Sequence, residues 1–395
     1  MKQYDVVIAG GAMAGATLAI ALDKLGGGQL KIAIVEAVEP KLDLHPGYDA
    51  RSIAISLGSA QQLDSIGCWQ ALSGVATAIS QIHVSDRGHA GIVHLDARER
   101  AVDALGYVVE LADAGRVFHR KLAKLDRVDL ICPAKIAGIE RHQHGVDLIL
   151  DNGDQLQSRL VVAADGAQSS VGDMLGLGRS EYDFEQVAVI ANVTTDEAHQ
   201  GRAFERFTPH GPVALLPMSE GRSSLVWCIR PGDQAEVMGW SDEMFLAKLQ
   251  EAFGWRLGRL SHTGVRHAYP LLLRQSLRLT SHRVAVVGNA AQTLHPIAGQ
   301  GFNLGLRDVM SLAEEICCEW AQAGDAGHTR VLSRYRQRRE PDREATVGMT
   351  AGLVGIFAND SMPFVAGRNL GLMAMECVDV LKAPLVRRAM GQVDR

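Results

Sequence analysis

The chain has 395 residues, of which 47% are hydrophobic and 22% are charged, and its formal net charge is −5. This composition supplies enough apolar material for a large core divided between two domains. The acidic balance argues against nucleic acid as a partner, because a phosphate backbone is bound by a basic face.

The residue pattern indicates neither a metal site nor a membrane span. The six cysteines lack the CxxC or Cys/His spacing of a zinc site, so we expect reduced thiols, no bound metal and a cytoplasmic location. The apolar run Val6–Ala9 is shorter than the core of a secretory signal. No window approaches the roughly 18 uninterrupted apolar residues of a spanning helix. Membrane contact is therefore expected to be at most peripheral, at the inner face.

The chain opens with a strand–helix–strand pattern. Tyr4–Ala9 is short, apolar and β-branched, which is typical of a buried parallel strand. A glycine-rich turn follows over 10–15, and Ala16–Leu25 is expected to form a helix that Gly26–Gly28 stops. Leu30–Val35 is expected to be the second strand.

The turn after the first strand matches the dinucleotide-binding fingerprint with one change. Gly10 would make the tight turn and Gly15 would let the helix pack on the strand, while Ala12 replaces the glycine that faces the pyrophosphate. The pyrophosphate would rest on the helix N-terminus. Glu36 follows Gly15 by about 20 residues, the spacing of an acid that binds a ribose. A purely structural turn is the alternative.

The middle of the chain is rich in predicted strands. In chain order these are Ile79–Val84, Gly91–Leu95, Tyr107–Leu111, the hairpin pair Ile136–Arg141 and Val146–Leu150, and Arg159–Ala164. A mostly antiparallel sheet is predicted for Val187–Val193, Arg202–Phe207, Val213–Pro217 and Ser223–Cys228. A helix at Asp242–Ala252, a buried strand at Arg283–Val287 and a long helical region from about Asn303 follow.

This order predicts an α/β fold in which a Rossmann-like nucleotide-binding domain is interrupted by a mostly antiparallel substrate domain. We expect the nucleotide-binding domain over 1–75, 105–180 and 275–345. The substrate domain is expected over 76–104 and 181–274, and a helical C-terminal region over 346–395.

Two further loops follow predicted strands. The first holds Asp165 and Gly166, and a lone Asp-Gly pair is also a common structural turn. The second, 288–308, is more specific: Gly299 and Gly301 permit unusual backbone angles and close approach of a ligand. The helix that begins near Asn303 would direct its free N–H groups at that ligand.

The stretch His295–Asp308 resembles the ubiquinone-biosynthesis hydroxylases, a family of the group A FAD-dependent aromatic monooxygenases. It carries His-Pro, an aliphatic and a small residue, Gly-Gln-Gly, and then Asn, Gly and Asp at the family's offsets. The resemblance covers nearly the whole chain. Within the family, 201–207, 210–212 and 288–292 are most similar to the branch that acts on 2-polyprenyl-6-methoxyphenol.

The resemblance implies FAD as cofactor. The residues it assigns to FAD are Gly10, Ala12, Gly15, Glu36, Arg51, Arg116, Asp165, Gly166, Asn289, Gly299, Gln300, Gly301 and Asn303. Arg51, in the segment 49–51, corresponds to an arginine that touches the flavin, and Arg116 to a residue near the ribityl chain. Two positions depart from the family: Asn289 replaces an aspartate, and Gly172 replaces an arginine that contacts the nicotinamide cofactor.

The implied reaction is hydroxylation of the methoxyphenol ring to 2-polyprenyl-6-methoxy-1,4-benzoquinol, through a flavin C4a-hydroperoxide. O₂ would be the co-substrate and NADH or NADPH the electron donor, with a site that excludes water. The implied partners are the prenylated phenol and other ubiquinone-biosynthesis proteins. His295 is the one candidate acid–base group beside the loop; a histidine bonded to backbone is the alternative.

Several alternatives stay open at this point. The chain could be a sister hydroxylase acting at another ring position, or a non-catalytic flavoprotein subunit of a biosynthetic assembly. A nicotinamide dehydrogenase would explain the first motif and leave 288–308 unexplained. The basic run Arg334–Arg339 fits either anionic lipid or a solvated helix face. The apolar segment Val347–Leu381 fits a prenyl tail, a partner, a membrane surface or ordinary helix packing.

Overall fold

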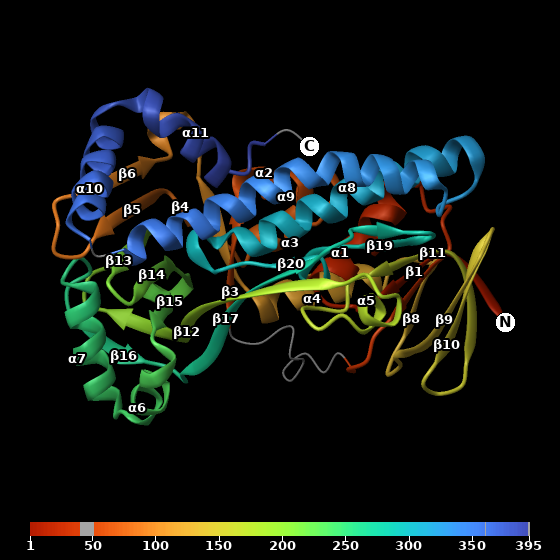
Figure 1. Cartoon of the computed structure of the whole chain (residues 1–395), viewed down its shortest axis with the longest axis horizontal. Coiled ribbons are helices and arrows are strands. Elements are labelled where there is room, and N and C mark those ends of the chain that lie inside the picture. The colour runs from red at the N-terminus through yellow and green to blue at the C-terminus, as the bar shows by residue number, and fades with distance from the viewer. Residues whose placement is uncertain (40–50, 360, 394–395) are drawn as a thin grey trace.

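The computed structural model describes residues 1–39, 51–359 and 361–393. The described chain is built on two large sheets and one small sheet, with long helices along one side (Figure 1). Asp49 and Ala50 of the predicted flavin segment lie outside the described residues. The α/β fold with a helical C-terminal region confirms the predicted fold class.

The first large sheet contains the strands that flank the predicted nucleotide-binding loops. Its strand order is β18 (Thr280–Ser281), β19 (Val284–Val286), β11 (Gln155–Ala163), β1 (Lys2–Ala9), β2 (Ile32–Val35) and β8 (Val128–Ile131). Strands β19 to β8 are parallel, and the hairpin β9 (Ile136–His142) and β10 (Gly145–Leu150) extends from β11. Helix α1 (Met13–Leu25) contacts both α4 (Leu111–Leu122) and α8 (Gln300–Ala323), which buries its small-residue face.

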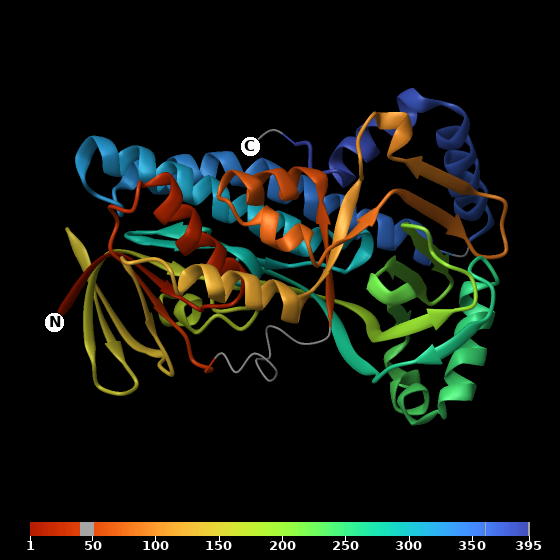
Figure 2. The same ribbon diagram turned by 180° about the vertical axis from the view of Figure 1, so that it is seen from behind.

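The second large sheet lies at the opposite end of the molecule from the N-terminus (Figures 1 and 2). Its order is β20 (Gln292–Thr293), β17 (His267–Ser276), β12 (Arg179–Thr195), β15 (Arg222–Ile229), β14 (Gly211–Pro217), β13 (Arg202–Thr208), β5 (Gln81–Asp86) and β6 (Ile92–Asp96), with β16 (Leu260–Thr263) beside β12. Every pair is antiparallel except β13 with β5. Residues of α6 (Gln234–Gly239) and α7 (Asp242–Phe253) pack a hydrophobic cluster against this sheet.

The remaining elements connect and cover the two sheets. The small antiparallel sheet is β3 (Ser52–Ser56), β7 (Gly106–Glu110) and β4 (Thr77–Ile79). The short helices are α2 (Leu57–Ser65), α3 (Trp69–Ser73) and α5 (Ser170–Met174). Helices α8 and α9 (Thr329–Ala358) lie side by side, and α10 (Met362–Cys377) packs on β6, followed by α11 (Asp379–Ala389) (Figure 1).

Element boundaries differ from the predictions at two functional loops. Helix α1 begins at Met13 rather than at Ala16, because Ala12 is extended and acts as its N-cap. Helix α8 begins at Gln300 rather than near Asn303. The glycines of both motifs that follow these caps therefore lie inside helices. The predicted domain boundaries stay predictions; β4 joins the small sheet, and β20 joins the second large sheet.

Candidate active site

The register of the first sheet brings four of the predicted loops to one edge. Ala9 pairs with both Val35 and Ala163, and Ala163 pairs in turn with Val286. The strands are parallel, so their carboxyl ends meet there. The loops that follow begin at Gly10, Glu36, Asp165 and Gly288, which is why motifs far apart in the sequence converge on one site.

A cavity of about 1230 Å³ extends from this edge to the second sheet and to the C-terminal helices. The predicted cofactor residues that line it are Gly10, Ala12, Glu36, Arg51, Asp165, Gly166, Asn289, Gly299, Gly301 and Asn303. The nucleotide edge forms one end and the loop 288–303 crosses the middle. The far end is lined by side chains of the second sheet and of α9, α10 and α11.

The glycine turn at the nucleotide end has the close backbone approaches that the fingerprint requires. Gly10 has a φ of 97°, and a Cβ on it would lie 2.5 Å from the carbonyl oxygen of Ala164. A Cβ on Gly15 would lie 1.9 Å from the carbonyl oxygen of Gly10. No side chain caps the N-terminus of α1, so its first turn can receive an anion. These residues fit the pyrophosphate of a dinucleotide.

Two acids hold this end of the cavity in shape. Glu36 is buried, and its carboxylate accepts hydrogen bonds from the backbone N–H groups of Gly11 at 2.6 Å and Val38 at 2.9 Å. Asp165 accepts from the N–H of Val171 at 3.1 Å, at the start of α5. Its other carboxylate oxygen is buried without a partner among the described residues, which leaves an acceptor at the cavity.

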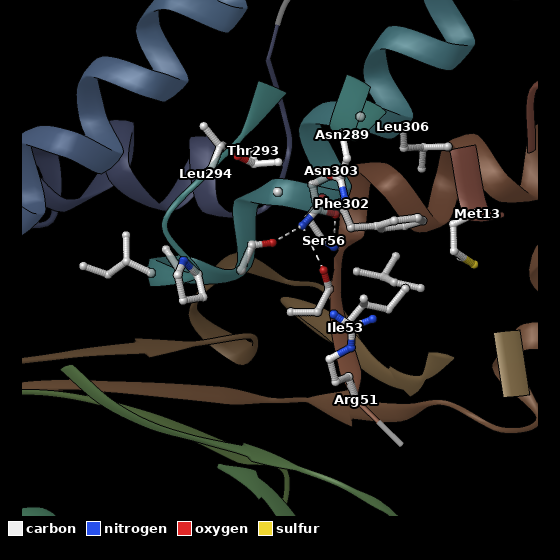
Figure 3. Close-up of a pocket in the computed structure, with 18 of the residues that line it drawn as sticks. Met13, Arg51, Ile53, Ser56, Asn289, Thr293, Leu294, Phe302, Asn303 and Leu306 are labelled. Carbon is white, nitrogen blue, oxygen red and sulfur yellow. Dashed lines mark hydrogen bonds between the residues drawn. The ribbon is translucent and has the colours of Figure 1, made fainter. Parts of the chain in front are cut away.

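The loop before α8 is fastened to the small sheet by Asn303. Its side-chain oxygen accepts from the N–H of Ser56 at 2.9 Å. Its amide nitrogen donates to the carbonyl oxygens of Ala54 at 2.9 Å and Gly299 at 2.7 Å (Figure 3). The amide is thereby bonded to the chain itself, so Asn303 shapes the loop by positioning Gly299, which has a φ of 60°.

Arg51 and Asn289 lie at the same part of the cavity. Arg51 precedes β3 and its guanidinium carbon lies 5.2 Å from the centre of the Tyr269 ring. Figure 3 shows Arg51, just before β3, and Ile53 of β3 on one side, with Asn289 and Phe302 on the opposite side. Asn289 is exposed at the cavity, in a short 3₁₀ turn.

Three predicted cofactor residues do not line the cavity. Gly15 supports the turn from inside α1, as described above. Gln300 is buried and donates to the carbonyl oxygen of Ala298 at 3.1 Å. Arg116 lies on α4, where it forms an ion pair with Asp113 one turn away. Arg116 is thus absent from the cavity lining, and its predicted place near the ribityl chain stays a prediction.

His295 also lies outside the cavity lining. It is 1% exposed; its Nε2 bonds the side-chain oxygen of Gln186 at 2.9 Å, and its Nδ1 accepts from the N–H of Ile297 at 3.3 Å. Its ring packs edge-on against Phe184. Burial lowers its pKa to about 4, so the ring is neutral at physiological pH. This geometry favours the alternative role, a histidine that fastens the loop.

The sequence interpretation missed one feature of the cavity, Glu205 on β13, a carboxyl group in an otherwise apolar wall. The apolar far end, where Leu353, Leu372 and Met375 line the cavity, lies within the segment Val347–Leu381, for which a prenyl tail was one of the open interpretations. Glu205 lies in the segment 201–207 that the family resemblance singled out, and alternation along β13 puts Ala203, Glu205 and Phe207 on one face, which is a signal that could have found it.

The other open segments can now be placed. Arg339, inside the basic run, is buried and ion-paired with Asp308, while Arg338 pairs with Glu314 and Glu315 of α8. The run is therefore not a free basic patch. The helices of the described residues include none long and apolar enough to cross a membrane. The described part of the chain also holds no cluster of His, Cys, Asp and Glu that suits a metal ion.

The comparisons with known proteins agree with this site. The family model described as FAD binding domain matches residues 3–350. A ubiquinone hydroxylase, UbiL, from Rhodospirillum rubrum is 37% identical over 99% of this chain and 90% of its own length. The 3-demethoxyubiquinol 3-hydroxylase of Escherichia coli is 32% identical over 98% of both chains.

A solved structure shows the same fold. The p-nitrophenol 4-monooxygenase PnpA from Pseudomonas putida DLL-E4 matches with a TM-score of 0.81 and 20% identity, over 100% of both chains. At 20% identity, this similarity shows the fold alone. Together with the family match and the site geometry, these findings show that the chain belongs to the FAD-binding-domain family and is an FAD-dependent aromatic-ring monooxygenase.

Proposed function

We propose that this enzyme hydroxylates the aromatic ring of a polyprenylated phenol in ubiquinone biosynthesis. The proposed substrate is 2-polyprenyl-6-methoxyphenol and the product 2-polyprenyl-6-methoxy-1,4-benzoquinol. The names of the two curated relatives support a ubiquinone precursor as substrate class. The choice of the methoxyphenol rests on the resemblance of the segments 201–207, 210–212 and 288–292.

The observation that carries the proposal is the apolar end of the cavity. Beyond the loop 288–303, the lining changes to aliphatic and aromatic side chains from the second sheet and the C-terminal helices. These are Ile82, Val84, Val93, Leu95, Phe207, Leu353, Ile356, Phe357, Leu372, Met375 and Leu385. A prenyl tail is an apolar chain whose burial gains about 0.8 kcal/mol for each methylene group. A site for a small polar phenol would not need this extension.

The residues of the chain would divide the work along the cavity. Gly10, Ala12 and Glu36 would hold the dinucleotide part of FAD, and the loop of Gly299 and Gly301 would lie along its ring system. When bound, FAD supplies the redox chemistry and the activation of O₂. The apolar walls exclude water from the reacting ring. NADH or NADPH is the proposed electron donor, although Gly172 lacks the side chain that usually contacts it.

A sister hydroxylase of the same pathway is the second candidate. It is favoured by the Escherichia coli relative, whose name places its reaction at the 3-position of a demethoxyubiquinol. Both candidates need a cavity with a ring site and an apolar end. They differ in the polar substituents that the ring presents to the wall of the second sheet.

The test is product identification with matched substrates. Purified protein loaded with FAD would be reduced without oxygen and then exposed to O₂ with a prenylated 2-methoxyphenol or a prenylated demethoxyubiquinol. We expect a product 16 mass units heavier, by mass spectrometry, from the methoxyphenol. Product from the demethoxyubiquinol alone would assign the sister reaction, and tight FAD binding without either product would refute both.

A further inference from the structure

Glu205 is the carboxyl group of the cavity wall formed by the second sheet. It lies on β13, pairs with Ala214 on β14 and with Val84 on β5, and lines the cavity. By surface area it is half-buried, and since it lines the cavity its exposed part is accessible from there.

The register of the sheet shows how isolated this carboxyl group is. The cross-strand row that contains it runs over β12, β15, β14, β13, β5 and β6 as Ile190, Val226, Ala214, Glu205, Val84 and Val93, all lining the cavity. The next row is Ser224, Leu216, Ala203, Ile82 and Leu95, which line it as well. Glu205 is thus the single charged side chain in two rows of small and apolar residues.

The titratable groups on the surrounding elements do not neutralise it. Cys228 on β15 is buried with a raised pKa, and His295 beside the loop has a lowered pKa, so both are neutral at pH 7. Arg368 on α10 lines the cavity but is ion-paired with Asp86 at 2.8 Å. Arg206 follows Glu205 on β13, and His83 precedes its partner Val84 on β5. Because side chains alternate along a strand, both point to the other face of the sheet.

Burial without a cation makes this carboxylate unfavourable. Burial raises the pKa of Glu205 to about 7, and a hydrogen bond from the backbone N–H of Ala298 lowers it in part. Ala298 has a φ of 56°, an unusual value for a residue with a side chain, and directly precedes Gly299. Desolvation of this carboxylate, between the loop 288–303 and the apolar wall, costs free energy. A carboxyl group with a raised pKa that lines a cavity is therefore a candidate for a functional role.

We propose that Glu205 binds the phenolic hydroxyl of the substrate and accepts its proton during ring hydroxylation. This inference rests on the proposed function, because it needs a phenol in the cavity. The phenolic O–H bond breaks and an O–H bond forms on the Glu205 carboxylate. The electron pair stays on the phenol oxygen and raises the electron density of the ring carbon, which gains a bond to one oxygen atom of O₂ and loses its proton. The O–O bond breaks, the second oxygen atom leaves as water, and the nicotinamide donor supplies the two electrons.

The first test is binding to the oxidised FAD enzyme, which requires no turnover. The wild type, Glu205→Gln and Glu205→Ala are titrated with a prenylated 2-methoxyphenol and with its methyl ether, which lacks the O–H group. We expect the wild type at pH 8 to prefer the phenol by about tenfold to a hundredfold, the worth of a hydrogen bond to a charged group. Glu205→Gln should lose most of that preference. Equal preference in the wild type and Glu205→Gln would overturn the proposal.

The second test is the pH profile of product formation under saturating substrate. The wild type should gain activity as the pH rises through about 7, as Glu205 ionises. Glu205→Gln should be slower by roughly a hundredfold at pH 8, within the usual range for a general base, and should lose this rise. The control Glu251→Gln removes a carboxylate that is 61% exposed on α7 and should behave like the wild type.

The glutamine and alanine variants separate this role from a structural one. Glutamine retains an acceptor for the Ala298 N–H, whereas alanine does not. Normal activity in Glu205→Gln with loss only in Glu205→Ala would show that Glu205 merely holds the loop, and would overturn the proposal. If the wild type yields no product from the phenol, the proposed function fails instead, so the two failures are distinguishable.

Discussion

At the scale of single residues, the glycine turn depends on a hydrogen atom at a position where a methyl group would collide with the backbone. Gly15 lies inside α1, where helix propensity alone would favour alanine. Glycine is required at this position because a Cβ would collide with the carbonyl oxygen of Gly10. The cost of a glycine in a helix is offset by the close packing of that helix on β1.

We therefore expect Gly15→Ala to impair FAD binding and to destabilise the fold by at least about 1–3 kcal/mol, the usual cost of overpacking. The added Cβ would displace Gly10 and, with it, the turn that faces the pyrophosphate. Fluorescence titration with FAD and thermal unfolding measure both effects. The control is Gly74→Ala at the end of α3, where φ is −68° and the nearest atom lies 3.8 Å away. Equal behaviour of the two variants would contradict this account.

Glu205 gives a second prediction at this scale, on stability against pH. Its folded-state pKa of about 7 exceeds the ordinary value of 4.5, so the folded state binds the proton more tightly than the unfolded state. Its contribution to stability is full below pH 4.5, falls as the pH rises to about 7, and is lost above that. Glu205→Gln has no such loss. The difference in Tm between this variant and the wild type should grow from pH 4.5 to 7 and then level off, and a constant difference would count against the buried carboxylate.

At the scale of elements, a buried ion network joins α8 to α9. Asp342 on α9 accepts from the Nε of Arg307 at 2.7 Å and from Nη2 of Arg339 at 2.6 Å. Arg339 also donates to Asp308 at 2.8 Å, and Asp308 accepts from the side chain of Gln292 at 2.7 Å. The network therefore connects α9, through α8, to the strand β20 in the loop 288–303.

Removal of Asp342 should be costly because it leaves the buried guanidinium group of Arg307 without a carboxylate and that of Arg339 with Asp308 alone. We expect Asp342→Ala to lower the free energy of unfolding by about 3–5 kcal/mol, as measured by urea denaturation. Glu340→Ala on the same helix is the matched control. The side chain of Glu340 is 50% exposed, and its Oε1 lies 3.8 Å from the Nε of Arg336. Its removal should therefore lower the free energy of unfolding by no more than about 0.5 kcal/mol. A similar decrease in the free energy of unfolding in both variants would show that burial does not determine how much this network stabilises the fold.

At the scale of the whole molecule, the cavity joins parts that are distant in the sequence. One end is made by the first sheet, the middle by the loop 288–303 and the second sheet, and the apolar end by the second sheet and helices from the C-terminal region. Phe357 of α9 stacks on Phe207 of the second sheet with ring centroids 3.5 Å apart. This contact closes the apolar end between sheet and helices.

A charge placed at the apolar end should affect long substrates alone. We expect Met375→Glu to raise the KM for a prenylated phenol at least tenfold, because the tail would desolvate a carboxylate, while FAD affinity and turnover of an unprenylated methoxyphenol stay unchanged. Met373→Glu is the control: Met373 is on the same helix, is 46% exposed and does not line the cavity. If both substrates respond equally to Met375→Glu, the tail does not occupy this end.

The sequence by itself determined the local parts of this protein. The strand–helix alternation, the glycine turn at Gly10 and the loop at Gly299 are set by backbone sterics and hydrophobic periodicity, which act over a few residues. The family resemblance added FAD and the ring-hydroxylation chemistry. The parallel register then explains why the predicted loops lie at one edge, since parallel strands align their carboxyl ends.

Only the tertiary structure decided the relations between distant segments. The side chain of Asn303 on α8 bonds to Ser56 of the small sheet, His295 lies outside the cavity lining, and Arg116 pairs with a neighbour on its own helix. The apolar surroundings of Glu205 come from six strands whose register no local pattern specifies. Side-chain environment depends on which elements pack together, and that packing is settled by the sum of many weak contacts over the whole core.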